Sequence, residues 1–95
     1  MRAVFYGTPA EAVPALEALG GIAEVVLVTT RADKPRGRSG RLQAPPVKEA
    51  ALALGLELSQ PARASHDLDR LRSLAPDVAV VVAYGRLIPE KLLAI

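Results

Sequence analysis

Four short apolar runs, separated by stretches of a different periodicity, set the expected secondary structure of the chain. They predict strands at residues 3–6, 25–28 and Val78–Val82, and a weaker strand at residues 56–58. The run Val78–Val82 contains no polar residue, and such continuous apolar character is typical of a strand that is buried on both faces of a sheet.

The stretches between these runs carry apolar residues three or four positions apart, which is the spacing of one face of a helix. The first helix is expected where residues 13, 16 and 19 share an apolar face, and the second from residue 46 to residue 54. The third is expected where residues 68, 71 and 75 share an apolar face. Strands and helices in this alternating order predict an α/β fold with a Rossmann-like, doubly wound parallel sheet. The sequence ends on the apolar residues 92–95, so we expect a truncated sheet, the front part of a longer domain.

Composition narrows the class of protein. The 95 residues suffice for one domain at most, and 51% of them are hydrophobic, so the chain can bury a core. The absence of cysteine excludes disulfides and thiolate metal sites, and we expect no metal. Neither a signal peptide nor an apolar run near the roughly 20 residues that cross a bilayer is visible, so we expect a soluble cytoplasmic protein without a membrane partner.

Charge is concentrated in one segment, residues 31–41. It holds five of the 12 basic residues, opposed by Asp33 alone, and leaves 7 basic and 9 acidic residues elsewhere. Pro35, Gly37 and Gly40 argue against a regular helix or strand, so we expect a flexible loop. The loop is long for a strand-to-helix connection, and its four arginines suit bidentate phosphate recognition. We therefore expect it to bind phosphate or RNA; a solvated loop that only aids solubility is the alternative.

The turn after the first strand reads Gly7-Thr8-Pro9-Ala10-Glu11. Thr8 and Glu11 are spaced as a capping box, with Thr8 as the N-cap and Pro9 as the first helical residue, which needs no ligand. Ligands nevertheless bind at the carboxyl ends of strands in such sheets, so the turn is also a candidate site. The glycine spacing of a dinucleotide fingerprint is absent, which disfavours NAD. The single histidine, His66, is expected to be exposed and not catalytic.

Three motifs, in order along the chain, resemble the N-terminal part of the methionyl-tRNA formyltransferase family. They are Val4-Phe5-Tyr6-Gly7-Thr8-Pro9 with Val13-Pro14-Ala15-Leu16, Asp33-Lys34-Pro35-Arg36-Gly37-Arg38 with Pro46-Val47-Lys48, and Val81-Val82-Ala83-Tyr84-Gly85-Arg86-Leu87-Ile88-Pro89. The combination is far more specific than any one motif. Because the match covers essentially the whole chain, residues 1–95 are expected to be the N-terminal part of a Rossmann-like formyltransferase domain.

The resemblance implies transfer of a formyl group from 10-formyltetrahydrofolate to the amino group of methionine on initiator tRNA, a step of translation initiation. It further implies that the cationic segment binds the acceptor region of that tRNA. Arg38 would be the principal contact, supported by Lys34, Arg36 and Arg41.

The same resemblance implies roles for the two other motifs. Gly7, Thr8 and Pro9 would lie near the acceptor end of the tRNA. Arg86, Leu87 and Ile88 would help to bind the folate, largely through backbone groups. The catalytic Asn, His and Asp of the family are expected beyond Ile95, so no catalytic residue is assigned and the 95 residues alone are expected to be inactive.

Two alternatives stay open. The first is another folate-dependent formyltransferase, acting on a nucleotide or a sugar-nucleotide; such a small substrate would not need the cationic segment. The second is a non-catalytic α/β module that binds RNA.

Overall fold

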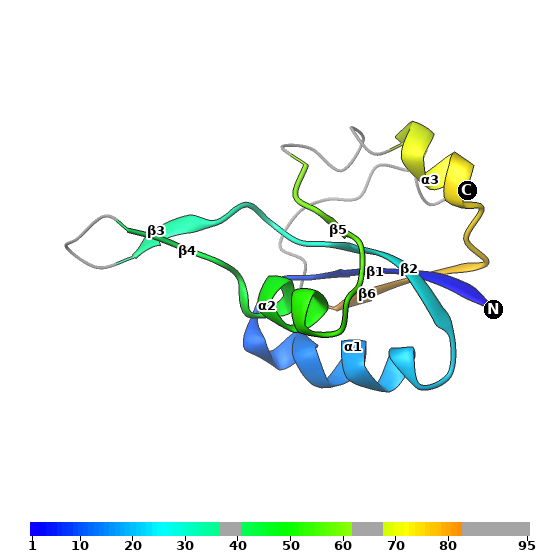
Figure 1. The fold of residues 1–95 in the computed structure, drawn as a ribbon, viewed down its shortest axis with the longest axis horizontal. Helices are drawn as coiled ribbons and strands as arrows, with labels where there is room; N and C mark the ends of the chain where they lie inside the picture. Colours follow the sequence, from blue (N-terminus) through cyan, green and yellow to red (C-terminus); the bar gives the residue numbers. More distant parts are fainter. Residues whose placement is uncertain (37–40, 62–67, 83–95) are drawn as a thin grey trace.

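The computed structural model of the chain describes residues 1–36, 41–61 and 68–82. In this part of the chain, four parallel strands form one sheet in the order β5-β2-β1-β6, and two antiparallel strands, β3 and β4, form another (Figure 1). The strands of the larger sheet are β1 (Arg2–Gly7), β2 (Glu24–Thr29), β5 (Leu58–Ser59) and β6 (Val78–Val82). The predicted α/β class and the parallel, doubly wound sheet are confirmed.

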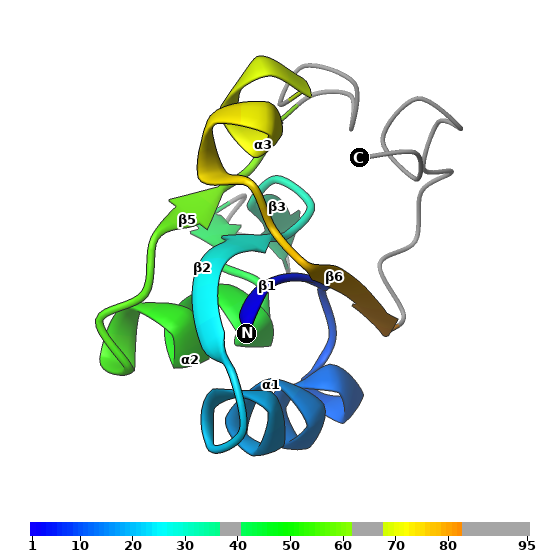
Figure 2. The ribbon, with the colours of Figure 1, turned by 90° about the vertical axis from the view of Figure 1, so that its right-hand side faces the viewer.

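Helices cover both faces of this sheet (Figure 2). The short 3-10 helix η1 (Ala10–Ala12), α1 (Val13–Gly20) and α2 (Pro46–Ala53) lie on one face, and α3 (Leu68–Leu74) lies on the other. The predicted apolar face of the first helix is confirmed, because Leu16 and Leu19 are buried and Val13 packs against the core.

The central strand β1 divides the core into two layers. Ala3 and Phe5 pack with the side chains of α1 and α2, whereas Val4 and Tyr6 pack with Leu71 of α3. This division follows from the alternation of side chains along a strand. A β-bulge interrupts the pairing with β2, because the register shifts between Ala3 and Val4.

The third helix differs from its prediction at its end. Ala75 was expected on the apolar face, but α3 ends at Leu74 and Ala75 is exposed with φ of 48°. The ring of Pro76 disfavours helical backbone in the residue before it, so the chain turns out of the helix at Ala75. Leu74 packs against the core in its place.

Strand β6 has the predicted bounds but not the predicted burial on both faces. Val78, Val80 and Val82 pack toward the layer of α1, whereas Ala79 and Val81 are exposed, Val81 by 47%. The reason is that β6 lies at the edge of the sheet as the described residues form it, and α3 packs over β1 and β2 instead. The weaker predicted strand at residues 56–58 is found slightly later, as β5.

Candidate functional site

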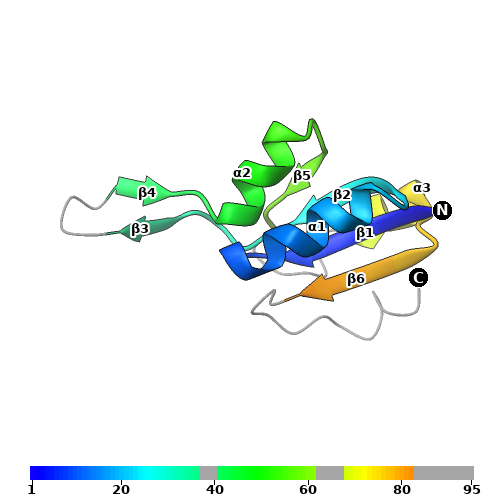
Figure 3. The same cartoon turned by 90° about the horizontal axis from the view of Figure 1, so that it is seen from below.

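The carboxyl ends of β1 and β6 meet at one edge of the sheet (Figure 3). Gly7, the last residue of β1, is the register partner of Val82, the last residue of β6. The chain runs outward from β1 through β2 to β5 and then crosses to the opposite side of β1 to form β6. The strand order therefore reverses between β1 and β6, and this is the point at which doubly wound sheets bind ligands.

Gly7 is required here by close packing. A Cβ atom on Gly7 would lie 2.7 Å from Cε1 of Phe5, 3.0 Å from Cβ of Ala12 and 3.0 Å from the carbonyl oxygen of Val82. Any side chain at this position would push apart β1, η1 and β6. The residue thus allows three elements to converge at the edge where the strand order reverses.

The turn after Gly7 does not form the predicted capping box. The first helical residue is Ala10 and the cap position is Pro9, so Thr8 lies one residue too early to be the cap and Pro9 is not within the helix. Thr8 instead joins neighbouring elements. Its Oγ1 accepts a hydrogen bond of 3.4 Å from the backbone N–H of Arg31, and its carbonyl accepts one of 3.3 Å from the N–H of Val47. The turn is thereby held to the end of β2 and to the start of α2.

A shallow hollow of about 190 Å³ lies beside this turn. Its wall combines the turn, the segment after β2 and residues 43–46, which lead into α2: Thr8, Pro9, Ala32, Gln43, Ala44, Pro45 and Pro46. These side chains are small or apolar apart from the Thr8 hydroxyl and the Gln43 amide, and none of them is titratable. The hollow can receive a small uncharged group of a ligand, but its lining supplies no acid or base.

The cationic segment forms a hairpin, so the prediction that it excludes a regular strand is wrong. β3 (Lys34–Arg36) pairs antiparallel with β4 (Arg41–Gln43), and the ribbon projects beyond the carboxyl edge of the sheet (Figure 3). Pro35 is compatible with this arrangement because, in a ribbon of two strands, alternate N–H groups point away from the partner and need no ladder bond.

The register of the hairpin brings its basic residues together. Arg36 is the partner of Arg41, and Lys34 is the partner of Gln43. Two arginines opposite each other are unfavourable unless a counter-charge lies nearby. The arrangement therefore favours an anionic ligand.

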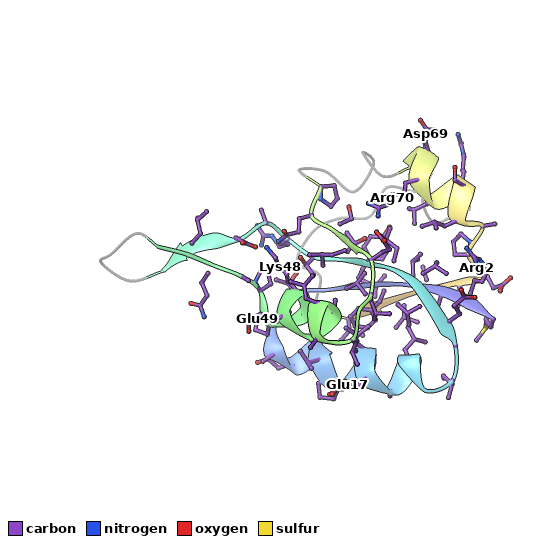
Figure 4. All side chains as sticks on the ribbon, in the orientation of Figure 1. Arg2, Glu17, Lys48, Glu49, Asp69 and Arg70 are labelled. Carbon is purple, nitrogen blue, oxygen red and sulfur yellow. The ribbon has the colours of Figure 1, made fainter. Side chains whose placement is uncertain are left out.

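Asp33 anchors the base of this hairpin. Lys48, which projects from α2 (Figure 4), donates from Nζ to both carboxylate oxygens, at 3.1 and 3.0 Å. Gln60 Nε2 donates to Oδ1 at 2.8 Å. These hydrogen bonds hold the pKa of the Asp33 carboxyl below its ordinary value, that from Gln60 foremost and that from Lys48 next. The single acidic residue of the basic segment is thus engaged by α2 and by the segment after β5.

Several predicted site residues lie outside the described part of the chain. Arg38 is one, and so are Arg86, Leu87, Ile88 and His66. Of the others, Gly7, Thr8 and Pro9 border the reversal point and the hollow, while Lys34, Arg36 and Arg41 belong to the hairpin. Among the described residues no group of three His, Cys, Asp or Glu could hold a metal ion, and no helix is long and apolar enough to cross a membrane.

Sequence reasoning missed the anchoring role of Asp33 and Gln60. In the sequence, Asp33 stands out only as a charge opposed to the basic residues, and no pattern singles out Gln60. Their contact spans 27 residues of sequence, so no local pattern reveals it. The only indication in the sequence is the length of the connection before Pro46. A long connection keeps one orientation only if contacts with other elements hold it.

Known proteins resemble this chain in sequence and in fold. Residues 2–95 match the family described as formyl transferase. A methionyl-tRNA formyltransferase of Hydrogenobaculum sp. is 48% identical over 95 residues, which is 100% of this chain and 32% of that protein. One of Thermus thermophilus is 50% identical over 97 residues, again 100% of this chain and 32% of the relative. The chain thus spans about a third of the length of these curated relatives.

A solved structure resembles the fold. It is glycinamide ribonucleotide transformylase 1 from Symbiobacterium toebii, with a TM-score of 0.64 over 99% of this chain and 46% of that one. The sequence identity is 18%, so this likeness concerns the fold alone.

Proposed function

The chain belongs to the formyl transferase family, and we propose that it is the N-terminal part of the formyltransferase domain of an enzyme that formylates methionyl initiator tRNA. The proposed donor is 10-formyltetrahydrofolate. Relatives that bear the name methionyl-tRNA formyltransferase at 48–50% identity support this substrate pair. Because initiator tRNA is charged and used in the cytoplasm, we propose that compartment as well.

One observation carries the proposal. The cationic hairpin projects from the carboxyl edge of the sheet, next to the turn at Thr8 and Pro9 and to the hollow beside it. Asp33, the acidic residue next to the hairpin, is itself engaged by Lys48. A polyanion that follows the hairpin would reach the point where the strand order reverses. tRNA is such a polyanion, and its acceptor end is the part that must reach a reaction centre.

The proposed contacts are as follows. Arg38 is the principal phosphate contact, and Lys34, Arg36 and Arg41 support it. Gly7, Thr8 and Pro9 lie near the acceptor end, where the hollow takes an uncharged part of it. Arg86, Leu87 and Ile88 bind the folate, largely through backbone groups.

The reaction itself is attack of the methionyl amine on the formyl carbon. A new C–N bond forms while the bond from the formyl carbon to the folate nitrogen breaks; the amine loses a proton and the folate nitrogen gains one. This needs a general base and donors to the carbonyl oxygen. The lining of the hollow has donors in the Thr8 hydroxyl and the Gln43 amide but no general base, so we place the base in the part of the relatives that this chain does not cover.

The test is formylation by the full-length protein, with 10-formyltetrahydrofolate and charged initiator tRNA, compared with the 95 residues alone. We expect formyl-methionyl-tRNA from the full-length protein and no turnover above the uncatalysed rate from the segment. Formylation of a nucleotide or sugar-nucleotide in place of tRNA would favour the first alternative. RNA binding without any transfer by the full-length protein would favour the binding module.

A further inference from the structure

Two buried polar groups at the end of β2 have no hydrogen-bond partner. They are Oγ1 of Thr29, whose side chain is fully buried, and Nε of Arg31, whose side chain is partly buried. An unpartnered polar atom that has lost its water destabilises a protein, and a charged group does so more strongly. Two such atoms within three residues require an explanation, and a bound ion is one that would satisfy both.

The two groups lie on the same face of the sheet. The N–H groups of Val28 and Thr30 donate toward β5, to Glu57 and Ser59, whereas the N–H of Arg31 donates back toward β1, to Thr8. The alternation of an extended strand therefore continues through Arg31. Residues 29 and 31 share a face, and it is the face of α3, because Leu27 packs there and Val28 packs on the other.

The backbone that carries Arg31 is fixed. Its N–H donates to Oγ1 of Thr8 at 3.4 Å, and its carbonyl accepts bonds from Nε2 of Gln60 at 3.0 Å and Oγ1 of Thr30 at 2.9 Å. Its charge, in contrast, has no ion-pair partner among residues 1–36, 41–61 and 68–82. The ion pairs of the described residues join Arg2 to Glu24, Lys48 to Asp33 and Arg70 to Glu57, and Arg31 belongs to none of them.

We propose that Arg31 and Thr29 form an oxyanion site on the α3 face, which takes a phosphate group of the RNA that the hairpin binds. An oxyanion supplies the acceptors that the Nε–H and the Thr29 hydroxyl lack, and a counter-charge that no described residue gives Arg31. Phosphate on an RNA strand is favoured because Arg31 lies three residues before β3, so a polyanion on the hairpin already lies close to it. The RNA part of this assignment rests on the proposed function, whereas the oxyanion part does not.

The experiment compares the full-length protein with its Arg31→Gln and Thr29→Val variants. The first arm measures melting temperature in inorganic phosphate against chloride at equal ionic strength. We expect phosphate to raise the melting temperature of the unaltered protein by about 2–4 °C, and to do so in neither variant. Without phosphate, Thr29→Val should melt no lower than the unaltered protein, because it replaces an unpartnered hydroxyl by a methyl group. This variant therefore separates loss of the site from loss of the fold.

The second arm measures the salt dependence of binding to an acceptor-stem RNA. Arg31→Gln should weaken binding on the order of tenfold and reduce the log-log slope by about 0.7–0.9, as for one phosphate contact. Arg70→Gln removes the same charge from α3, where Arg70 is exposed and paired with Glu57, and is the control that should leave both readouts unchanged.

The outcomes separate the possibilities. One outcome is that phosphate raises the melting temperature of the unaltered protein only, while Arg31→Gln leaves the log-log salt slope of RNA binding unchanged. That outcome would overturn the RNA assignment and leave a site for free phosphate. No difference between the variants and the unaltered protein in either arm would overturn the site, even in an enzyme that formylates tRNA normally. If the full-length protein transfers no formyl group, the proposed function is refuted. The oxyanion site is still supported if phosphate raises the melting temperature of that protein but not of its Arg31→Gln variant.

Discussion

Lys48 Nζ lies 3.1 and 3.0 Å from the two carboxylate oxygens of Asp33, fifteen residues earlier in the chain. This pair ties the first turn of α2 to the segment that leads into β3. It also means that the acidic residue closest in sequence to the hairpin neutralises a lysine of the body of the protein. The hairpin therefore has a fixed base.

Replacing Asp33 by Asn is expected to lower the free energy of unfolding above about pH 5 and to flatten its decline below about pH 4. The pKa of this carboxyl lies below its ordinary value of 3.8 in the folded protein. A group of this kind stabilises the fold above its unfolded pKa, and the contribution is lost as the pH falls through the folded pKa. Urea unfolding of the full-length protein from about pH 3 to pH 7 measures the difference. Asp69→Asn, at an exposed carboxylate of α3, is the control; identical profiles for Asp33→Asn and the unaltered protein would contradict the expectation.

Arg38→Ala in the full-length protein should lower kcat/KM for initiator tRNA by about 5- to 150-fold, the equivalent of about 1–3 kcal/mol for a charge-assisted hydrogen bond. The log-log salt slope should fall by about 0.7–0.9, and the affinity for the folate should change little. Steady-state kinetics at two salt concentrations provide the test. Lys91→Ala removes a cation outside the hairpin and should change neither kcat/KM nor the salt slope. Equal effects of the two substitutions would indicate that the hairpin is only a solvated surface feature.

Gly7→Ala should destabilise the protein by about 1–3 kcal/mol, the usual cost of overpacking a well-packed core. The added methyl group would lie 2.7 Å from the ring of Phe5, which is fully buried, and 3.0 Å from the backbone oxygen of Val82. Neither can withdraw without moving a strand. Gly20→Ala, where nothing lies within 4 Å, is the matched control and should be neutral or stabilising by up to about 1 kcal/mol. Urea unfolding compares the two, and equal stabilities would show that the edge of the sheet tolerates a side chain.

Ala75→Gly should stabilise the protein by about 0.5–1 kcal/mol. Its φ of 48° costs a residue with a Cβ about 1–2 kcal/mol, and the greater freedom of glycine in the unfolded chain offsets only about 0.4–1 kcal/mol of that gain. Ala18→Gly, at an exposed position inside α1, should have the opposite sign. Thermal melting of both variants would decide, and a lower melting temperature for Ala75→Gly would contradict the argument.

The main sheet was largely predictable because its strands are short, apolar and bounded by turn residues. The bounds of β6 were predicted correctly from the run Val78–Val82, because five consecutive apolar, mostly β-branched residues favour a strand over other structures. Its burial was not predictable, because the position of a strand within a sheet depends on pairing that no local pattern contains. Likewise, the end of α3 at Leu74 depends on the conformation of Ala75 before Pro76.

The site was predictable only in part. The turn at Gly7 and the charge of residues 31–41 are visible in the sequence, but the hairpin that Lys34 and Arg36 help to form is not. Pro35 obscured it, because proline is compatible with a strand only at positions that need no ladder bond. The unpartnered groups of Thr29 and Arg31 are equally hidden, since burial without a partner is a property of the packed protein.

The register that places Arg36 opposite Arg41 makes the hairpin responsive to its ionic surroundings. Like charges across a ladder oppose pairing, and a two-stranded ribbon is only marginally stable by itself. A polyanion that lies across these cations relieves their repulsion, so by linkage its binding and the formation of the ribbon strengthen each other. Monovalent salt then acts in two opposite directions, because it screens the repulsion within the ribbon while it competes for the phosphates. We expect the ribbon to be least ordered in dilute buffer without RNA, where neither counter-charge nor screening is present.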